Sequence, residues 1–349
     1  MQIVIDGRPF TVREGKTVLE VCREANIFIP TLCHDARLEP YGGCRMCIVE
    51  IKGTPRPVAS CTTPVMDGMA ISTSTPQIEE LRRLALELIL SDHPNDCMTC
   101  EKAGSCELQE LAYRYEVKPG EYFGEQRNLP KREDNPFITY EPSKCILCAR
   151  CTRICHEVVM ADTIELVGRG FHAMPDTAYS VPRSLENCEF CGQCVSTCPT
   201  GALTDRKGRG QGRSRDLKKV KTTCSYCGTG CNFYLNVKNN RVIKVTSAYD
   251  APVNQGNLCI KGRYGYDFIH SPDRLTTPLI RNGSGFRESS WDEALGLIAT
   301  KFRELINRYG PDKVGAFSSA RCTNEENYLL AKWVRCAVGS NNVDNCARV

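Results

Sequence analysis

Cysteine is the residue type on which the chemistry of this chain depends. Twenty-three of its 349 residues are cysteine, and most stand two or three residues apart in short groups. Such spacing lets several thiolates of one loop meet at a single metal centre. The alternative is a disulfide scaffold, but those are usually short secreted chains. The opening segment MQIVIDGRPFTV has neither the basic nor the apolar part of a secretory signal. We therefore expect a cytoplasmic metalloprotein with reduced thiols.

Two runs with the spacing C-x2-C-x2-C-x3-C give the strongest signal. They consist of Cys145, Cys148, Cys151 and Cys155, and of Cys188, Cys191, Cys194 and Cys198. In the bacterial ferredoxin motif the fourth cysteine of each run binds the other run's cluster. We therefore predict one [4Fe–4S] cluster on the first three cysteines of the first run plus Cys198. A second is predicted on the first three of the second run plus Cys155. His156 replaces the usual proline after the first run, which affects the turn but not the ligands.

A third group lies near the N-terminus and consists of Cys33, Cys44, Cys47 and Cys61, preceded at the close pair by two glycines. Glycine lets backbone amides turn toward cluster sulfurs, and such hydrogen bonds tune the reduction potential. The string YGGCRMC resembles the [2Fe–2S] module of respiratory NADH dehydrogenases and cytosolic hydrogenases. Unrelated core cysteines or a zinc site are the alternatives. Cys22 lies on the apolar face of an expected helix and is interpreted as a core residue.

A fourth group contains one histidine. It consists of His93, Cys97, Cys100 and Cys106. Three thiolates and one imidazole could also hold structural zinc. The string HPNDCMTCEKAGSCELQ, however, resembles the His-ligated [4Fe–4S] motif found beside the previous module in the same families. An imidazole in place of a thiolate removes one negative charge, which should raise the reduction potential.

The last complete group consists of Cys224, Cys227, Cys231 and Cys259. It resembles the N-terminal [4Fe–4S] site of bis-pterin molybdenum and tungsten oxidoreductases. In that family a lysine two positions after the fourth cysteine lies between cluster and pterin, and the residue here is Lys261. The resemblance implies that its ammonium binds the pterin and offsets cluster charge. The alternative for Lys261 is an ordinary solvated surface lysine.

The end of the chain, residues 318–349, resembles the formate dehydrogenase branch of that family. There the metal-binding selenocysteine or cysteine directly follows a segment like NCARV. The resemblance implies that no catalytic residue lies within this chain and that the catalytic ligand is expected immediately after Val349, where a selenocysteine codon would have been taken as a stop. Cys346 matches the cysteine of the preceding segment and is interpreted as structural. Cys322 and Cys336 are interpreted as packing residues.

The expected elements indicate a multi-domain α+β fold. Short strands flank the Asp6-Gly7 turn, a helix follows Thr17, and another spans residues 76–90. Residues 291–349 alternate helix and strand, an α/β pattern. With the resemblances, the predicted domains are a β-grasp [2Fe–2S] ferredoxin-like domain (1–75), a His-ligated [4Fe–4S] domain (76–136), a 2×[4Fe–4S] ferredoxin domain (137–205), a basic linker (206–220), a [4Fe–4S] domain of the molybdenum/tungsten type (221–280), and the start of an α/β pterin-binding domain (281–349).

The formal charge of +4 does not indicate nucleic-acid binding. Bound clusters with their thiolates would bring the charge to about −5. Eight Lys and Arg residues lie between Arg206 and Lys221, but no aromatic residue interleaves them. A solvated, mobile connection between domains is therefore favoured over a binding surface for nucleic acid or an acidic partner. The longest apolar run, near residues 84–90, is too short to span a bilayer, so no membrane insertion is expected.

Together these resemblances imply a formate dehydrogenase. Formate and carbon dioxide would interconvert at molybdenum or tungsten held by two molybdopterin guanine dinucleotides. One [2Fe–2S] and four [4Fe–4S] clusters would carry electrons, in chain order from the Cys224 group through the ferredoxin runs and the His93 group to the Cys33 group. The implied partners are flavin- and NAD(P)-binding iron–sulfur subunits, or a hydrogenase- or ferredoxin-linked complex. The alternatives are an electron-relay subunit of an NADH dehydrogenase or hydrogenase complex, an iron-only hydrogenase, and a short adaptor without an active site.

Overall fold

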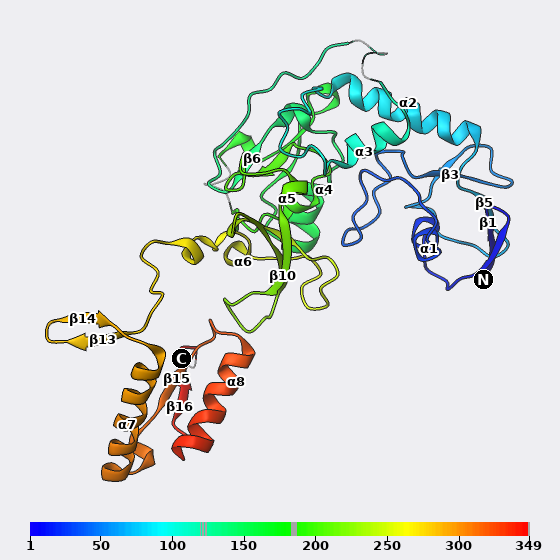
Figure 1. Ribbon diagram of the computed structural model, residues 1–349. Coiled ribbons are helices and arrows are strands. Elements are labelled where there is room, and N and C mark those ends of the chain that lie inside the picture. The colour runs from blue at the N-terminus through cyan, green and yellow to red at the C-terminus, as the bar shows by residue number, and fades with distance from the viewer. Residues whose placement is uncertain (119, 121, 123, 183–186, 348–349) are drawn as a thin grey trace. The chain divides into compact units, whose positions relative to one another are not determined.

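The computed structural model describes residues 1–118, 120, 122, 124–182 and 187–347 (Figure 1). The chain divides into two compact units, Met1–Leu217 and Lys218–Val349. The boundary falls inside the basic stretch 206–220. Each unit has its own elements and its own core, so each is described by itself.

The first domain of the first unit is a five-stranded mixed sheet with one short helix. Its strands are β1 (Gln2–Ile5), β2 (Arg8–Thr11), β3 (Ile48–Ile51), β4 (Val58–Ala59) and β5 (Ala70–Ser72), in the order β2-β1-β5-β3-β4. Asp6 and Gly7 both have positive φ, which is the backbone of the expected tight hairpin turn. Helix α1 (Val18–Glu24) begins with a capping box between Thr17 and Glu20. The predicted α+β domain is confirmed.

Two helices continue this domain rather than standing apart from it. Helix α2 (Pro76–Asp92) begins at the N-cap Thr75, and α3 (Glu107–Arg114) begins after Cys106. Leu32 and Met46, from the loops that carry the first cysteine group, are buried in one apolar cluster with residues of α2 and α3. The first two sequence modules therefore share a core.

A buried arginine strengthens this junction. Arg82 of α2 donates hydrogen bonds to the backbone carbonyls of Met46 at 3.0 Å, Ile48 at 2.8 Å and Thr73 at 3.1 Å. Its guanidinium also contacts the Tyr115 hydroxyl at 3.4 Å. A planar guanidinium with five donors can satisfy several carbonyls at once. Arg82 therefore links the sheet, the cysteine loop and the helices.

The ferredoxin-like domain is built from short elements around two cysteine loops. These elements are β6 (Ile138–Tyr140), α4 (Arg150–Arg153), a π-helical turn (Ile154–Val159), β7 (Glu165–Val167), β8 (Met174–Asp176), α5 (Gln193–Thr197) and β9 (Leu203–Asp205). Strand β6 pairs with β9, and β7 pairs with β8. The two cysteine runs repeat the same backbone: Leu147 and Ala149 have positive φ, as do Phe190 and Gly192 at the equivalent positions. The internal repeat seen in the sequence is therefore also a structural repeat.

Asp176, at the end of β8, is a buried carboxylate of this domain that accepts several hydrogen bonds. It accepts hydrogen bonds from Arg132 at 2.7 Å, from the Thr177 amide at 2.8 Å and from the Ser180 hydroxyl at 2.9 Å. Burial by itself would raise the pKa of the Asp176 carboxyl, but these donors together lower it.

We expect Asp176→Asn to lower the free energy of unfolding by about 2 kcal/mol at neutral pH, because it removes charged hydrogen bonds. Because the pKa of Asp176 is lower in the folded protein than in the unfolded chain, the carboxylate stabilises the fold at every pH above the ordinary pKa of an Asp carboxyl. This stabilisation is lost as the pH falls from the ordinary pKa through the lowered pKa. The difference between wild type and variant should therefore narrow only below about pH 4. Denaturant unfolding of both proteins across pH measures it. A difference that is already absent at pH 7 would contradict this account.

The second unit begins with a three-stranded antiparallel sheet and ends with a parallel β-α-β unit. Its elements are β10 (Lys218–Thr223), β11 (Asn232–Lys238), β12 (Arg241–Ser247), α6 (Ile260–Tyr264), the hairpin β13 (Leu279–Asn282) and β14 (Gly285–Glu288), α7 (Trp291–Tyr309), β15 (Ala316–Ser318), α8 (Asn324–Trp333), a π-helical turn (Val334–Val338) and β16 (Val343–Asn345). Strands β15 and β16 are parallel, with α8 between them in sequence. The predicted α/β pattern is confirmed, and its first helix is α7.

The basic stretch 206–220 is not the solvated connection that its composition suggests. Arg213 donates to the carbonyls of Cys100 and Met98, and Arg209 pairs with Glu141. Arg206 donates to the backbone carbonyls of Glu133 and Asn135, just before the ferredoxin-like domain. The expectation of a solvated, mobile linker is therefore wrong for these arginines. Loops that turn their amides inward leave carbonyls facing outward, and these arginines supply the donors.

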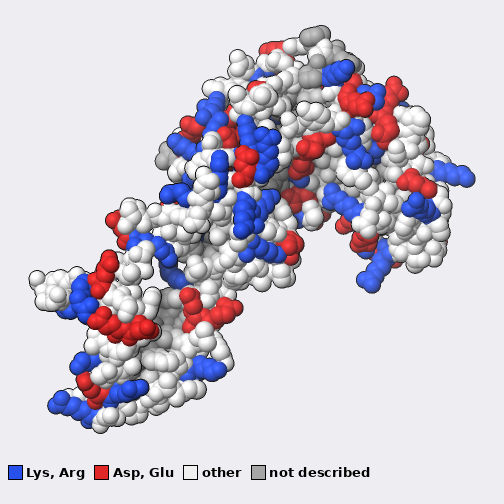
Figure 2. Space-filling model, in the orientation of Figure 1, with Lys and Arg blue, Asp and Glu red and all other residues white. Residues whose placement is uncertain are grey.

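The surface carries charges of both signs. Figure 2 shows Lys and Arg side chains interspersed with Asp and Glu side chains on the face drawn. Among the residues that the structure describes, no helix combines the length and apolar character needed to cross a bilayer.

Candidate iron–sulfur sites

The N-terminal cysteine group converges to one place in the first domain. The Sγ atoms of Cys47 and Cys61 are 3.4 Å apart, and Cys33 and Cys44 also form a hydrogen-bonded pair. The hydrogen bond with Cys44 lowers the pKa of Cys33 to about 6, and the hydrogen bond with Cys61 lowers the pKa of Cys47 to about 6. The same hydrogen bonds raise the pKa of Cys44 and of Cys61 well above the usual thiol range, so one thiol of each pair loses its proton readily while its partner retains it.

Backbone amides point at these sulfurs, as the glycines before Cys44 predict. The Cys33 sulfur accepts from the amides of Gly43 and Cys44, and the Leu32 amide lies 3.4 Å from the Cys44 sulfur. Cys22 is buried in the apolar core of the sheet, and burial raises its pKa to about 12. A thiol held protonated in an apolar core is a packing residue, in agreement with its interpretation.

The histidine group contains a buried imidazole and two buried thiols. His93 is the C-cap of α2, and its Nε2 atom is buried without a hydrogen-bond partner. Burial lowers the pKa of His93, which keeps the ring neutral and able to bind metal. Burial raises the pKa of Cys106 to about 11, with Cys100 nearby. Cys97 is exposed and lies in a turn, where its carbonyl accepts a hydrogen bond from the Cys100 amide. A bound metal ion would supply the partner that the buried His93 nitrogen lacks.

The two ferredoxin runs are interleaved in space. One cavity is lined by Cys145, Cys148, Cys151 and Cys198. A second cavity is lined by Cys155, Cys188, Cys191 and Cys194. Each cavity therefore takes its fourth cysteine from the other run, which is the grouping that the spacing predicts. Burial raises the pKa of Cys145 to about 11 and that of Cys148 well above its usual range.

The backbone in these loops supplies the charge compensation that buried thiolates need. Residues with positive φ before Cys148 and before the helix that follows it turn amides toward the sulfurs, and the Leu147 amide lies 3.4 Å from the Cys145 sulfur. Successive amides that face one concavity form an anion-binding nest. The first cavity therefore fits an anionic iron–sulfur cluster, and the loop of the second cavity repeats its backbone with positive φ at Phe190 and Gly192.

The fifth group lies in the second unit, at the start of β11 and of α6. The Cys224 amide donates to the Cys231 carbonyl at 2.8 Å, and Cys259 is the N-cap of α6. Electrostatic interactions join Cys224, Cys227 and Cys259 to Cys231. Lys261 lines the same cavity as Cys224. Its charge acts to lower the pKa of both Cys224 and Cys227, although burial leaves that of Cys224 raised. Lys261 itself is exposed to solvent, so its charge acts on these thiols from the surface and its role toward a pterin stays a prediction.

The remaining cysteines behave differently from one another. Cys322 is half-buried, but Cys336 is exposed, so its interpretation as a packing residue is wrong. In the turn Val334–Val338 the two end valines enter the small core, and Cys336 lies between them on the opposite side. Cys346 is exposed, with its sulfur 3.4 Å from the Ser319 hydroxyl. The last two residues of the NCARV segment, Arg348 and Val349, lie outside the described residues.

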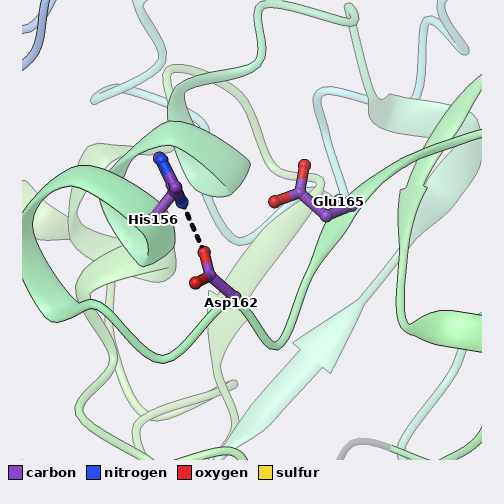
Figure 3. Close-up of side chains that lie close together, drawn as sticks. All are labelled: His156, Asp162 and Glu165. Atoms are coloured by element: carbon purple, nitrogen blue, oxygen red, sulfur yellow. Dashed lines mark hydrogen bonds and ion pairs between the residues drawn. The ribbon is translucent and has the colours of Figure 1, made fainter.

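One cluster of side chains escaped the sequence reasoning. His156, Asp162 and Glu165 lie close together on the surface of the ferredoxin-like domain, with His156 Nδ1 2.6 Å from Asp162 (Figure 3). The hydrogen bond that the His156 ring donates to the Asp162 carboxylate raises the pKa of His156. The unusual histidine after Cys155 was the available signal. All three side chains are exposed, and such acidic groupings commonly occur without a bound ion.

Comparison with known protein families gives a match for each of the successive segments. The matched descriptions are a 2Fe-2S iron-sulfur cluster binding domain (1–76), the NADH-ubiquinone oxidoreductase-G iron-sulfur binding region (82–120), the ferredoxin-like domain of NADH-quinone oxidoreductase subunit 3 (135–204), the molybdopterin oxidoreductase Fe4S4 domain (217–271) and molybdopterin oxidoreductase (274–349).

Several curated proteins are similar over the whole chain. The NADPH-Fe(3+) oxidoreductase subunit alpha of Geobacter sulfurreducens is 39% identical over 349 residues, which are 100% of this chain and 40% of that protein. An NADH-quinone oxidoreductase subunit of Rhizobium meliloti is 37% identical, again over 100% of this chain and 40% of that protein. A Staphylococcus aureus protein with a provisional formate dehydrogenase name is 32% identical over 99% of this chain and 39% of its own length. The chain thus spans about 40% of the length of these relatives.

A solved structure agrees with these matches. A chain of an NAD+-reducing [NiFe]-hydrogenase, in its H2-reduced state, has 27% sequence identity and a TM-score of 0.56, covering 59% of this chain and 87% of that chain. Together with the geometry, the comparisons show that this chain joins a 2Fe-2S domain, an NADH-G-type iron–sulfur region and a ferredoxin-like domain to the beginning of a molybdopterin oxidoreductase domain.

Proposed function

We propose that this chain is the iron–sulfur electron-transfer part, and the beginning of the catalytic part, of a formate dehydrogenase. Its twenty proposed ligands would hold one [2Fe–2S] and four [4Fe–4S] clusters. The observation that carries the proposal is the Cys224 cavity with Lys261 on its wall. This site opens a segment that matches molybdopterin oxidoreductases, directly after three iron–sulfur domains. Bound clusters would exchange single electrons, and a pterin-held molybdenum or tungsten would exchange two.

The chain's own residues would perform distinct tasks at these sites. Thiolates and the neutral His93 ring would hold iron, and inward-facing amides would offset the negative charge of the sulfurs. Lys261 would place a cation beside Cys224 and Cys227, and its three donors could bind polar groups of a pterin. Burial of Cys145, Cys151 and Cys198 would exclude water from the iron of their cluster.

Formate is the substrate favoured by the end of the chain. Residues 318–349 resemble the formate dehydrogenase branch, and one relative carries that name at 32% identity. The proposed partners are flavin- and NAD(P)-binding iron–sulfur subunits, because similar chains belong to an NADH-quinone oxidoreductase and to an NAD+-reducing hydrogenase.

A second candidate is an electron relay that takes its electrons from NADH or NADPH. Two relatives with nicotinamide-linked names are 39% and 37% identical, which is more than the relative with the formate name. In this case the first unit would work as proposed, but the molybdopterin domain would not act on formate.

Anaerobic purification of the full-length protein with its partner subunits tests both candidates. We expect a brown protein with about 18 iron atoms per chain, the sum for one two-iron and four four-iron sites. Formate should bleach the cluster absorbance, and the molybdenum or tungsten content should be measurable by elemental analysis. Bleaching by NADPH or NADH but not by formate would favour the relay. A colourless protein that holds zinc would exclude both.

A further inference from the structure

Helix α4 and the turn after it carry ligands of both ferredoxin-type sites. Cys151 lines one cavity and Cys155 lines the other. Arg150 and Arg153 lie among these cysteines and extend toward a different domain. Each donates to the backbone of the loop 33–41, which begins at the first cysteine of the N-terminal group.

Arg153 holds this loop at both ends. It donates to the carbonyl of Cys33 and to the carbonyl of Glu39, each at 2.6 Å. Its guanidinium also lies over the ring of Tyr41, 4.9 Å from the ring centre. A rigid guanidinium fork can make two such bonds and a cation–π contact together, whereas an ammonium cannot.

Tyr41 links Arg153 to the glycine that precedes the close cysteine pair, Cys44 and Cys47. A Cβ on Gly43 would lie 2.4 Å from the Tyr41 ring, so the ring is packed directly on that glycine. The Gly43 amide in turn hydrogen-bonds the Cys33 sulfur, and the Arg153 guanidinium lies beside the same residue, on its carbonyl. The guanidinium therefore acts on the first cysteine group through its charge and through the shape of the loop.

Other residues of α4 and α5 also bind the loop 33–41. Arg150 is buried, donates to the His34 carbonyl at 2.7 Å and forms a two-oxygen pair with Glu107 at 2.8 and 2.9 Å. Asp35 accepts from the Thr197 hydroxyl at 2.6 Å. The loop is thus attached to α4 and α5 at several points, and Arg153 is the one that also reaches Tyr41.

We propose that Arg153 is a positioning residue, which fixes the Cys33–Tyr41 loop on the helix that carries Cys151 and raises the reduction potential of a cluster bound at Cys33. This proposal rests on the proposed iron–sulfur function. The physical basis is that a reduced cluster is more negative, so a nearby cation favours reduction. Loss of the fork would also release two carbonyls and the ring that orders Gly43.

The test compares Arg153→Gln, Arg153→Lys and Arg169→Gln in the full chain. Arg169 is exposed in the same domain, so its replacement removes the same charge away from the loop. Redox titration followed by electron paramagnetic resonance should show a lower midpoint potential for the [2Fe–2S] signal in Arg153→Gln. Arg153→Lys should restore most of the potential. Amide hydrogen exchange of peptides from residues 33–43 should be about tenfold faster in both Arg153 variants, because lysine cannot replace the fork.

The readouts separate this proposal from the proposed function. If wild-type protein lacks iron, the iron–sulfur function fails. If the iron content of all variants is normal but neither potential nor amide exchange differs from Arg169→Gln, the role of Arg153 is wrong while the function stands. If Arg153→Gln does not fold, unchanged amide exchange in Arg153→Lys would overturn the proposal.

Discussion

Replacing Cys155 with alanine is expected to empty the site of the other cysteine run and leave that of its own run intact. Cys155 lines the cavity of Cys188, Cys191 and Cys194, whereas the first three cysteines of its own run line a different cavity with Cys198. Loss of one four-iron cluster should lower the iron content from about 18 to about 14 atoms per chain. Iron analysis and electron paramagnetic resonance of the reduced protein measure the loss.

Paired variants make this prediction specific. The spectrum of Cys155→Ala should match that of Cys188→Ala, and that of Cys198→Ala should match Cys151→Ala. Cys22→Ala is the matched control, because Cys22 is a buried thiol in the apolar core and its loss should leave the iron content unchanged. A Cys155→Ala spectrum that matches Cys151→Ala instead would show that each run holds its own cluster.

Adding one methyl group at Gly201 is expected to disrupt the histidine site. A Cβ there would lie 2.5 Å from the Cys100 sulfur, and 3.5 Å from Cβ of Lys102. A free thiol could rotate away, but a sulfur bound to iron is fixed, so the clash must be relieved by moving a domain. We expect Gly201→Ala to cost about 2–3 kcal/mol of stability. It should also remove or broaden the signal of the His93 cluster.

The neighbouring contacts explain why the structure cannot easily yield at Gly201. Lys102 donates to the Cys198 carbonyl at 3.0 Å, and the Glu107 amide donates to the Pro199 carbonyl at 2.9 Å. Gly124→Ala is the control, because a Cβ at this exposed glycine would meet no atom within 4 Å. Thermal unfolding and low-temperature spectra compare the two. Equal behaviour of both variants would show that the domains are not packed this tightly around Cys100.

Local features of the fold were predictable from the sequence. The Asp6-Gly7 hairpin, α2 and α7 follow from turn residues and apolar periodicity, which act over a few residues. The grouping of Cys155 with Cys188 followed from the bacterial ferredoxin motif, in which the fourth cysteine of each run binds the other run's cluster. Ligation itself remains a prediction. The four residues of the His93 group were identified from the sequence. The structure adds that the His93 Nε2 atom is buried without a hydrogen-bond partner.

Contacts between distant segments were not predictable. Arg213 looked like part of a solvated linker, but its partners are carbonyls of residues more than a hundred positions earlier. The attachment of the Cys33 loop to α4 likewise depends on carbonyls, which no sequence pattern reveals. The predicted chain-order path for electrons did not anticipate this direct contact between the first domain and the ferredoxin-like domain. Cys336 was misassigned because a π-helical turn shifts which side chains reach the core.

The hydrogen bonds of Arg82 have a consequence for how these domains can be recombined. The first family match ends at residue 76, and this border suggests that residues 1–76 are a complete domain that can be exchanged as a unit. Yet three of its carbonyls depend on a guanidinium that lies beyond this border. A gene fusion cut at the family border would leave those carbonyls without their donor and uncover Leu32 and Met46. The smallest transplantable piece therefore extends through Tyr115, so evolution would have to shuffle the two modules as a pair.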